Sequence, residues 1–513
     1  MTADALPALL ARDLGDAGYT VAGLRALWGE EADAALHRGH RVPARRALDA
    51  LPAGADDRAA TLARTFVLGL PADAARLERA LPAAGVAGVQ QLGLVRADGG
   101  TVIPTADLRP YSFTDAWGAA EWWIASDLGE VAVGGPLGED HVLGVGGASL
   151  TLAGLMVDRS SRLTLDLGTG CGIQALHASR HSGRVIATDI SERALRFARL
   201  NAALNGVSTI EFRHGSLFEP VAGETFDHIV SNPPFVITPR AEGVPAYEYR
   251  DGGLVGDAIV AAVIEGMSTH LAPGGVGQLL GNWEYRAGAG GLARVEGWLE
   301  ARAAEGHPLD AWVVEREVQP VELYTETWIR DGGTRPGPDF DRLAEAWLDD
   351  FAARGVSAVG FGYVTVRRPL PGAGVLRRFE HVESGGGALG PHIAATLAAH
   401  DWQAARDDAE FARAALTVAA DVTEERHYWP GDEHPAVMNL HQGGGFARSY
   451  PLDTALAAVV GASDGELSVA AICAAIAELL GSPDAPLSPD ALLAELVPTL
   501  RELVTVGILL PPA

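Results

Sequence analysis

The stretch LTLDLGTGCGI, residues 163–173, joins a short apolar run to a cluster of glycines, and an apolar helical pattern begins at Ile173. An apolar run that breaks into glycines is typical of a buried β-strand that passes through a tight turn into a helix. Small residues in such a turn let a bare backbone and a helix N-terminus approach a ligand closely. The spacing is Gly-x-Gly-x-Gly, whereas dinucleotide-binding turns carry Gly-x-Gly-x-x-Gly. The stretch therefore predicts an α/β domain whose first strand leads into a ligand-binding turn.

A second apolar run, FDHIV at 226–230, ends in the motif SNPPF at 231–235. The consecutive prolines fix the backbone, so the carbonyl group of Pro233 is held rigidly. That carbonyl and the amide oxygen of Asn232 can both accept hydrogen bonds from one NH2 group. The aromatic side chain after the prolines offers a face on which a planar group can stack. The motif predicts a site for a planar, conjugated nitrogen, formed by Asn232, Pro233, Pro234 and Phe235.

The glycine turn and the SNPPF motif together resemble the class I S-adenosylmethionine-dependent methyltransferases, in the branch with an Asn-Pro-Pro-aromatic motif. The resemblance implies a Rossmann-like fold, S-adenosyl-L-methionine as the cofactor and methyl transfer to nitrogen. Because the methyl donor is already activated, catalysis would consist mostly of positioning and electrostatics, without a strong general base.

The same resemblance implies which residues bind the cofactor. An acidic side chain after the second strand, here Asp189, would accept hydrogen bonds from both ribose hydroxyls, and Ile190 would pack on the adenine. Family members commonly carry an acidic residue where Ser216 stands, so a hydroxyl or the backbone would meet the adenine amino group here. The implied cofactor-binding residues are Asp166, Gly168, Thr169, Gly170, Cys171, Gly172, Asp189, Ile190, Ser216, Leu217 and Asn232.

Residues 160–368 alternate strand-like and helical patterns, as a doubly wound α/β domain should. The expected strands are 163–167, 184–188, 208–212, 226–231, 275–281, 310–318 and 356–367, and the expected helices are 173–181, 191–204, 254–271 and 289–306. The last two strands suit the antiparallel hairpin that closes methyltransferase sheets. An inserted helix is expected between them, at 339–353, and it departs from the minimal pattern.

Two lobes flank this domain. In the first, helical patterns such as 21–36 precede a hairpin with its turn at 98–100, which favours a winged-helix-like unit that either docks a substrate or covers the cofactor site. The second passes through a polar, aromatic loop at 427–441 and ends in three helical patterns, which favours a winged-helix or helical module. The expected parts are an α-rich lobe at 1–150, the methyltransferase domain at 151–368, a linker at 369–374 and a C-terminal lobe at 375–513.

Composition narrows the function further. The formal net charge is −27, from 39 basic and 66 acidic residues, so any nucleic-acid partner would need a local basic patch. The only cysteines, Cys171 and Cys473, cannot form a disulfide framework, which fits a reducing cytoplasm. We expect no membrane span and no secretory signal, hence a cytoplasmic protein. The histidines of 427–441 are irregularly spaced, so we expect a packed loop and no structural metal.

Three substrates share this motif in the family resemblance: adenine N6, guanine N2 and the side-chain amide of glutamine. The segment 247–257 is similar to one in release-factor glutamine methyltransferases, whereas Phe235 is more like the ribosomal RNA base methyltransferases. The first expectation is a nucleic-acid base in ribosomal or transfer RNA. The alternatives are a glutamine of a translation-related protein, a small molecule, and a non-catalytic binding factor that kept a vestigial pocket.

Overall fold

The computed structural model describes residues 5–52, 57–134, 137–241, 243–244, 250–370, 375–382, 389–481 and 486–512. Contacts divide the chain into a larger compact unit of Met1–Ala153, Ser160–Pro308 and Glu317–Arg368, and a smaller one of Gly154–Arg159, Leu309–Arg316 and Pro369–Ala513. Our finer division into three parts stays a prediction, and most of its linker, 371–374, lies outside the described residues. No described helix is long and apolar enough to cross a membrane.

An eight-stranded sheet has the order β13-β11-β12-β10-β9-β6-β7-β8. Strand β6 pairs in parallel with both β7 and β9, and β10 pairs in parallel with β9 and antiparallel with β12. The strand order therefore reverses at β6, and ligands of open α/β sheets bind at the carboxyl ends beside such a reversal. The strands are β6 Ser161–Leu167, β7 Ser182–Asp189, β8 Ile210–His214, β9 Phe226–Ser231, β10 Leu271–Arg286, β11 Asp310–Pro320, β12 Val356–Arg367 and β13 Arg377–His381.

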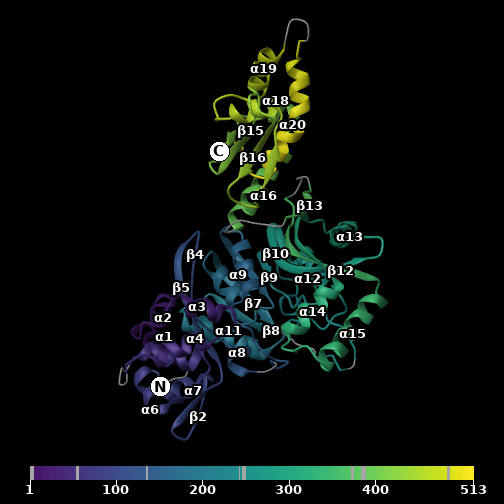
Figure 1. Ribbon diagram of the computed structural model, residues 1–513. Helices are drawn as coiled ribbons and strands as arrows, with labels where there is room; N and C mark the ends of the chain where they lie inside the picture. Colours follow the sequence, from purple (N-terminus) through teal and green to yellow (C-terminus); the bar gives the residue numbers. More distant parts are fainter. Residues whose placement is uncertain are drawn as a thin grey trace. The chain divides into compact units, whose positions relative to one another are not determined.

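Helices alternate with these strands, which confirms the expected Rossmann-like α/β fold (Figure 1). Helices α10 and α11 contact the strands β6 to β8, and α12 and α13 contact β10. Each of the four lies within a few residues of its expected position. Their bounds are α10 Ile173–Ser179, α11 Glu192–Leu204, α12 Ala258–His270 and α13 Gly291–Ala304.

Two inserted helices, and not the single one that we expected, separate β11 from β12. Helix α15 (Pro338–Ala353) is the predicted one, and α14 (Val321–Asp331) is new. Both helices contact β12 and each other. The prediction missed α14 because its sequence mixes polar and β-branched residues and buries only Tyr324, Thr325 and Ile329. So few buried positions give no clear helical periodicity in the sequence, and the apolar face of α14 is evident only from its packing in the folded structure.

The N-terminal part of the larger unit is α-rich, as expected. The predicted hairpin forms between β2 and β3, and β1 pairs with β3. The expected helix at 21–36 is wrong as one element, because Gly29 has φ +83° and separates two helices. The elements are α1 Leu6–Asp16, α2 Val21–Trp28, α3 Glu30–His37, α4 Val42–Asp49, α5 Arg58–Leu62 with a π-turn at Ala63–Val67, β1 Ala72–Asp73, α6 Ala74–Ala80, α7 Gly85–Gln91, β2 Val95–Asp98 and β3 Thr101–Pro104.

A long hairpin, β4 (Asp107–Asp115) and β5 (Gly118–Ser126), was not predicted from its aromatic sequence. Its β5 strand is bonded to the side chains of Asn201 in α11 and of Asn205, which directly follows that helix. The amide of Asn201 bonds both the N–H and the carbonyl of Ala125 and also donates to the Cys171 carbonyl, at 2.7, 2.9 and 2.8 Å. Asn205 bonds the N–H and carbonyl of Trp123 in the same way. The hairpin is thus fastened to the helix beside the glycine turn. Short helices α8 (Glu130–Val133) and α9 (Gly147–Leu155) follow it.

Asn201→Ala is expected to lower the free energy of unfolding of the larger unit by ~3 kcal/mol, because three buried backbone groups lose their partner. Asn201 is fully buried, whereas Asn205 is partly exposed and water can replace its bonds. Urea unfolding of the full chain, followed by tryptophan fluorescence, measures the loss, and Asn205→Ala is the matched comparison. Equal losses in the two variants would contradict the argument from burial.

The smaller unit contains the three expected C-terminal helices, α18 to α20. The expected loop at 427–441 is partly wrong, because its ends belong to the paired strands β15 and β16. No group of three metal-binding side chains occurs among the residues described. The elements are α16 Gly390–Ala404, α17 Asp408–Ala412, β14 Thr417–Val418, β15 Val422–His427, β16 Val437–Gln442, β17 Ser449–Pro451, α18 Thr454–Gly461, α19 Val469–Leu480, α20 Pro489–Thr505 and β18 Leu509–Leu510.

Candidate active site

The glycine turn joins β6 to α10, and its three glycines have positive φ angles of +75°, +56° and +88°. A Cβ atom at Gly172 would lie 3.0 Å from the Cβ of Ala198, so this glycine lets α11 pack closely. A Cβ at Gly168 or Gly170 would meet nothing within 4 Å. These two positions therefore border open space, and their bare backbone forms a cradle that a ligand can enter.

Asp166 is the penultimate residue of β6, beside this cradle, and is completely buried. One of its carboxylate oxygens accepts hydrogen bonds from the Thr169 hydroxyl at 2.5 Å and the Ala175 N–H at 2.9 Å. The other oxygen is buried without a partner. Burial raises the pKa of this carboxyl group to about 7. A buried acid with one unused oxygen is suited to meet a cationic group of a ligand.

Asp189 lies at the end of β7, where its side chain connects two backbone segments. One oxygen accepts the N–H of Gly170 at 2.8 Å, and the other accepts the N–H of Ser191 at 2.9 Å. Its own carbonyl accepts the N–H of Gly215 at 3.0 Å. The strand ends of β6, β7 and β8 are thus tied together by this one residue.

The remaining predicted cofactor residues lie at these same strand ends. Ile190 directly follows Asp189 and its side chain is 62% exposed. Ser216 and Leu217 follow β8 and are partly buried. Leu217 has φ +46°, one of two positive values among the described non-glycine residues, and such strained positions concentrate at functional sites. Cys171 is buried in the turn, and burial raises the pKa of its thiol to about 12.

Strand register places the SNPPF motif beside the glycine turn. Ser231 pairs with Leu167 and donates its hydroxyl hydrogen to the Leu167 carbonyl at 2.8 Å. Asn232 and Gly168, the next residues of the two neighbouring strands, therefore lie at the same edge of the sheet. The amide oxygen of Asn232 is buried without a partner. The Pro234 carbonyl accepts the N–H of Gly252 at 3.1 Å, whereas no bond to the Pro233 carbonyl forms within the described part of the chain. Two neighbouring acceptors are therefore left for a ligand.

Phe235 pairs with Asp251 in an isolated antiparallel bridge. Its half-buried ring packs against a cluster that includes Val236, Tyr324 and Trp347. The segment 247–257, which we compared with release-factor methyltransferases, supplies this bridge partner, although 247–249 lie outside the described residues.

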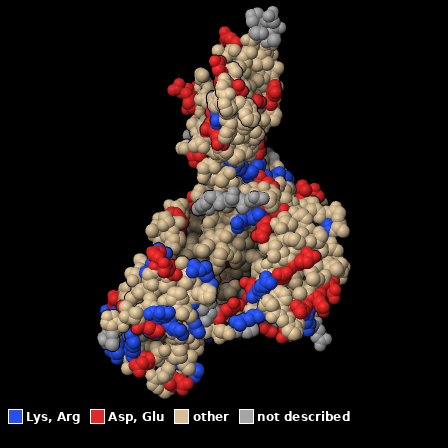
Figure 2. Space-filling model, viewed as in Figure 1, with Lys and Arg blue, Asp and Glu red and all other residues tan. Residues whose placement is uncertain are grey.

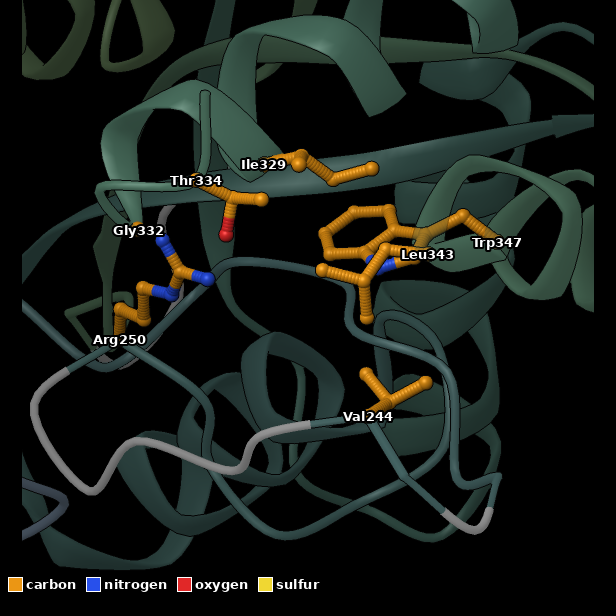
Figure 3. A pocket seen from close by; sticks show the side chains of 7 residues that line it. All are labelled: Val244, Arg250, Ile329, Gly332, Thr334, Leu343 and Trp347. Atoms are coloured by element: carbon orange, nitrogen blue, oxygen red, sulfur yellow. The ribbon is translucent and has the colours of Figure 1, made fainter. Parts of the chain in front are cut away.

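A small pocket lies near this bridge, on the side of the inserted helices. In Figure 3 apolar side chains face the guanidinium group of Arg250 and the hydroxyl of Thr334 across it. The Arg250 side chain donates to the Trp328 carbonyl at 3.0 Å and meets Asp331 at 3.3 Å. None of the predicted cofactor residues lines this pocket. Its residues are Val244, Arg250, Ile329, Gly332, Thr334, Leu343 and Trp347.

The sequence interpretation missed three residues that hold this site: Asn201, Asp251 and Tyr324. Asn201 carried a signal, since it falls among the apolar positions of α11, and a polar residue there must find a buried partner. Asp251 carried none, because it pairs with Arg240 between two loops that show no periodic pattern. Tyr324 carried none, because it lies in the unpredicted helix and its hydrogen-bond partners are 42 and 87 residues away.

The fold is that of a class I S-adenosylmethionine-dependent methyltransferase, and comparisons with known proteins agree. A model described as the methyltransferase small domain matches residues 144–246, and one described as a domain of unknown function (DUF7059) matches 16–105. A release factor glutamine methyltransferase of Xylella fastidiosa is 37% identical over 149 residues, which are 27% of this chain and 53% of that protein. The chain thus spans about half the length of this relative.

A putative protein N5-glutamine methyltransferase of Methanocaldococcus jannaschii is 34% identical over 135 residues, which are 26% of this chain and 68% of that protein. The chain belongs to the family of this methyltransferase. Among solved structures, a T. thermophilus 16S rRNA N2 methyltransferase in complex with AdoMet and guanosine is similar at 19% identity and a TM-score of 0.27, over 54% of this chain and 67% of that one.

Proposed function

We propose that this protein transfers a methyl group from S-adenosyl-L-methionine to a planar amino or amide nitrogen. The observation that carries the proposal is the pair of unused acceptors at the SNPPF motif, the buried Asn232 amide oxygen and the Pro233 carbonyl. Asn232 and Pro233 directly follow β9, the strand that pairs with β6, so they lie beside the glycine cradle at the end of β6. Two acceptors next to a cofactor cradle suit an NH2 group that must face the methyl donor.

The residues of the glycine turn fit the cofactor. The open space at Gly168 and Gly170 admits a ligand against the backbone, and the unused oxygen of Asp166 suits an ammonium group. Asp189 lies at the edge of this turn, and a carboxylate can accept several hydrogen bonds, which suits the hydroxyl groups of a ribose. When bound, the cofactor supplies an activated methyl group on a sulfonium centre.

The chain itself would orient the nucleophile. An NH2 group that donates one hydrogen to Asn232 and the other to Pro233 has both hydrogens held in a fixed plane. Its lone pair then projects from that plane instead of delocalising into the adjoining π-system. The rigid prolines pre-set this geometry, so little reorganisation is needed during the reaction. After transfer the nitrogen carries an extra proton, which is acidic enough to leave to water.

The side-chain amide of glutamine is the substrate that we favour. Both relatives described above are named as glutamine methyltransferases. Figure 2 shows acidic and basic side chains interspersed on the visible face, whereas a nucleic-acid partner would need a concentrated basic patch. A nucleic-acid base stays the second candidate, because the half-exposed ring of Phe235 offers a stacking face.

The test is transfer of tritiated methyl groups from the cofactor into fractionated cellular protein and RNA. Label in protein that digests to methylated glutamine would support the favoured substrate, and label in RNA would support the second. Transfer by the native protein and none by Asn232→Ala is expected in either case. Absence of transfer into both fractions, with the cofactor bound, would overturn the proposal.

The affinity for S-adenosylmethionine is expected to fall as the pH drops from 8 to 6. The pKa of Asp166 is raised to about 7 in the free protein, and contact with an ammonium group would lower it. Below pH 7 binding must then displace a proton from this carboxyl group, which costs roughly tenfold in affinity at pH 6. Calorimetric titration at pH 6, 7 and 8 measures the effect.

Asp166→Asn is the control for this pH dependence. The cofactor's own α-amino group titrates at about pH 8 and contributes to both proteins, so only the difference between them reports on Asp166. Protonation of that amino group favours binding as the pH falls, so the variant is expected to bind more weakly at pH 8 but not to lose affinity toward pH 6. A parallel decline in both proteins would contradict the assignment.

A further inference from the structure

Besides the packing of the Phe235 ring, a hydrogen bond from the buried side chain of Tyr324 links the inserted helix α14 to the chain that follows the SNPPF motif. The phenol oxygen of Tyr324 accepts the backbone N–H of Ile237 at 2.9 Å and the side-chain amide of Asn282 at 3.0 Å. Tyr324 is completely buried, and Asn282 is 1% exposed on β10. One oxygen atom therefore joins the inserted α14, the central strand β10 and the chain two residues after Phe235.

Beyond Ser231, backbone hydrogen bonds also attach the end of the motif to the segment 250–252. The N–H of Val236 donates to the Arg250 carbonyl at 2.9 Å, and the Pro234 carbonyl accepts from Gly252 at 3.1 Å. Asp251, between these partners, is bonded by both guanidinium nitrogens of Arg240. Residues 234–236 and 250–252 thus form one short ladder. This ladder is a loop pairing outside the main sheet, so it does not by itself fix the motif against β10.

We propose that Tyr324 is a positioning residue for methyl transfer, which holds the Asn232 and Pro233 acceptors in register with the cofactor cradle by fastening the following chain to β10. This inference rests on the proposed function, and it assigns to a residue of the inserted helices the role of supporting the geometry of the site. Tyr324 acts through Ile237 and touches neither cofactor nor substrate.

Two physical features let the Tyr324 bond control the acceptors. The prolines at 233 and 234 have fixed φ angles, so the segment from Asn232 to Ile237 has fewer backbone rotations with which to absorb a shift at Ile237. Asn282 also holds the phenol from the β10 side, at a point on β10 three residues beyond the Leu279–Ser231 pair. The same strand therefore sets both the start of the motif, through Ser231, and its end, through Tyr324.

The experiment compares native protein with Tyr324→Phe, which keeps the ring in its cluster and removes only the oxygen. The probe is tritiated methyl transfer from saturating S-adenosylmethionine into total cellular protein, and into total RNA, with the acceptor fraction varied. The maximal rate is expected to fall roughly tenfold, because a displacement well below 1 Å already impairs in-line transfer. The dissociation constant for the cofactor and the acceptor concentration at half-maximal rate are expected to stay unchanged.

Phe340→Leu is the matched control for stability. Phe340 belongs to the same buried cluster but makes no ring contact with Tyr324. The Phe340→Leu variant is expected to have a lower melting temperature than the native protein but the same maximal rate at temperatures below the unfolding transition. Equal rates for native protein and Tyr324→Phe, or equal rate losses in the two variants, would overturn the proposal about Tyr324. A native protein that transfers no methyl group would instead contradict the proposed function.

Discussion

Replacing Asn232 by alanine is expected to slow methyl transfer by about a hundredfold or more, the loss typical when one pre-organised hydrogen-bonding partner of a reacting group is removed. The substrate NH2 group would keep the Pro233 carbonyl but lose the acceptor that fixes its plane, so its lone pair would no longer be held toward the methyl donor. Cofactor affinity should fall far less, because the glycine turn, Asp166 and Asp189 remain. Single-turnover rates at saturating cofactor measure the first effect, and calorimetry measures the second.

Asn439→Ala is the matched control for this experiment, since Asn439 is a half-buried asparagine on β16 of the smaller unit. Its rate is expected to equal that of the native protein. Asn232→Asp adds a finer comparison, because aspartate keeps two acceptor oxygens but adds a negative charge to the site. If Asn232→Ala lost cofactor binding and kept its rate at saturation, Asn232 would belong to the cofactor site alone.

The catalytic core could be predicted from the sequence because its signals are local. An apolar run followed by glycines, or by two prolines, fixes a strand end whatever surrounds it, and the strands β6, β7 and β9 lie where they were expected. Parallel pairing then brings such strand ends to one edge of the sheet. The meeting of the glycine turn and the SNPPF motif follows from these two facts.

The parts that could not be predicted depend on partners that are distant in sequence. The β4–β5 hairpin is bonded by Asn201 and Asn205, about 80 residues further along the chain, and its aromatic sequence has no clear alternation. Helix α14 buries its apolar face against α15, β12 and the chain after Phe235, all distant or unpredicted at that point in the sequence. The hydrogen bond between the Ile237 N–H and the Tyr324 oxygen spans 87 residues, so no local sequence pattern predicts it.

Asp189→Ala is expected to weaken S-adenosylmethionine binding by about a hundredfold, since hydrogen bonds to a charged group contribute roughly 1.5–3 kcal/mol each and two ribose hydroxyls would lose their acceptor. The loss has a second source in the free protein. Without the carboxylate, the N–H groups of Gly170 and Ser191 lose their acceptor, so the cradle is less well ordered before the cofactor arrives. Calorimetric titration measures the affinity.

The two sources of this loss can be separated, because only one of them requires the cofactor. Loss of the backbone bonds lowers the thermal stability of the free protein, whereas loss of the ribose contacts lowers the stabilisation that added cofactor produces. Asp189→Asn keeps an acceptor oxygen for Gly170 or Ser191, so it should recover more stability than affinity. Asp339→Ala, at an exposed carboxylate on α15, should match the native protein in both measurements. A variant at Asp189 that binds the cofactor normally but transfers methyl groups slowly would show that this carboxylate acts on the reaction itself, and the ribose assignment would then fail.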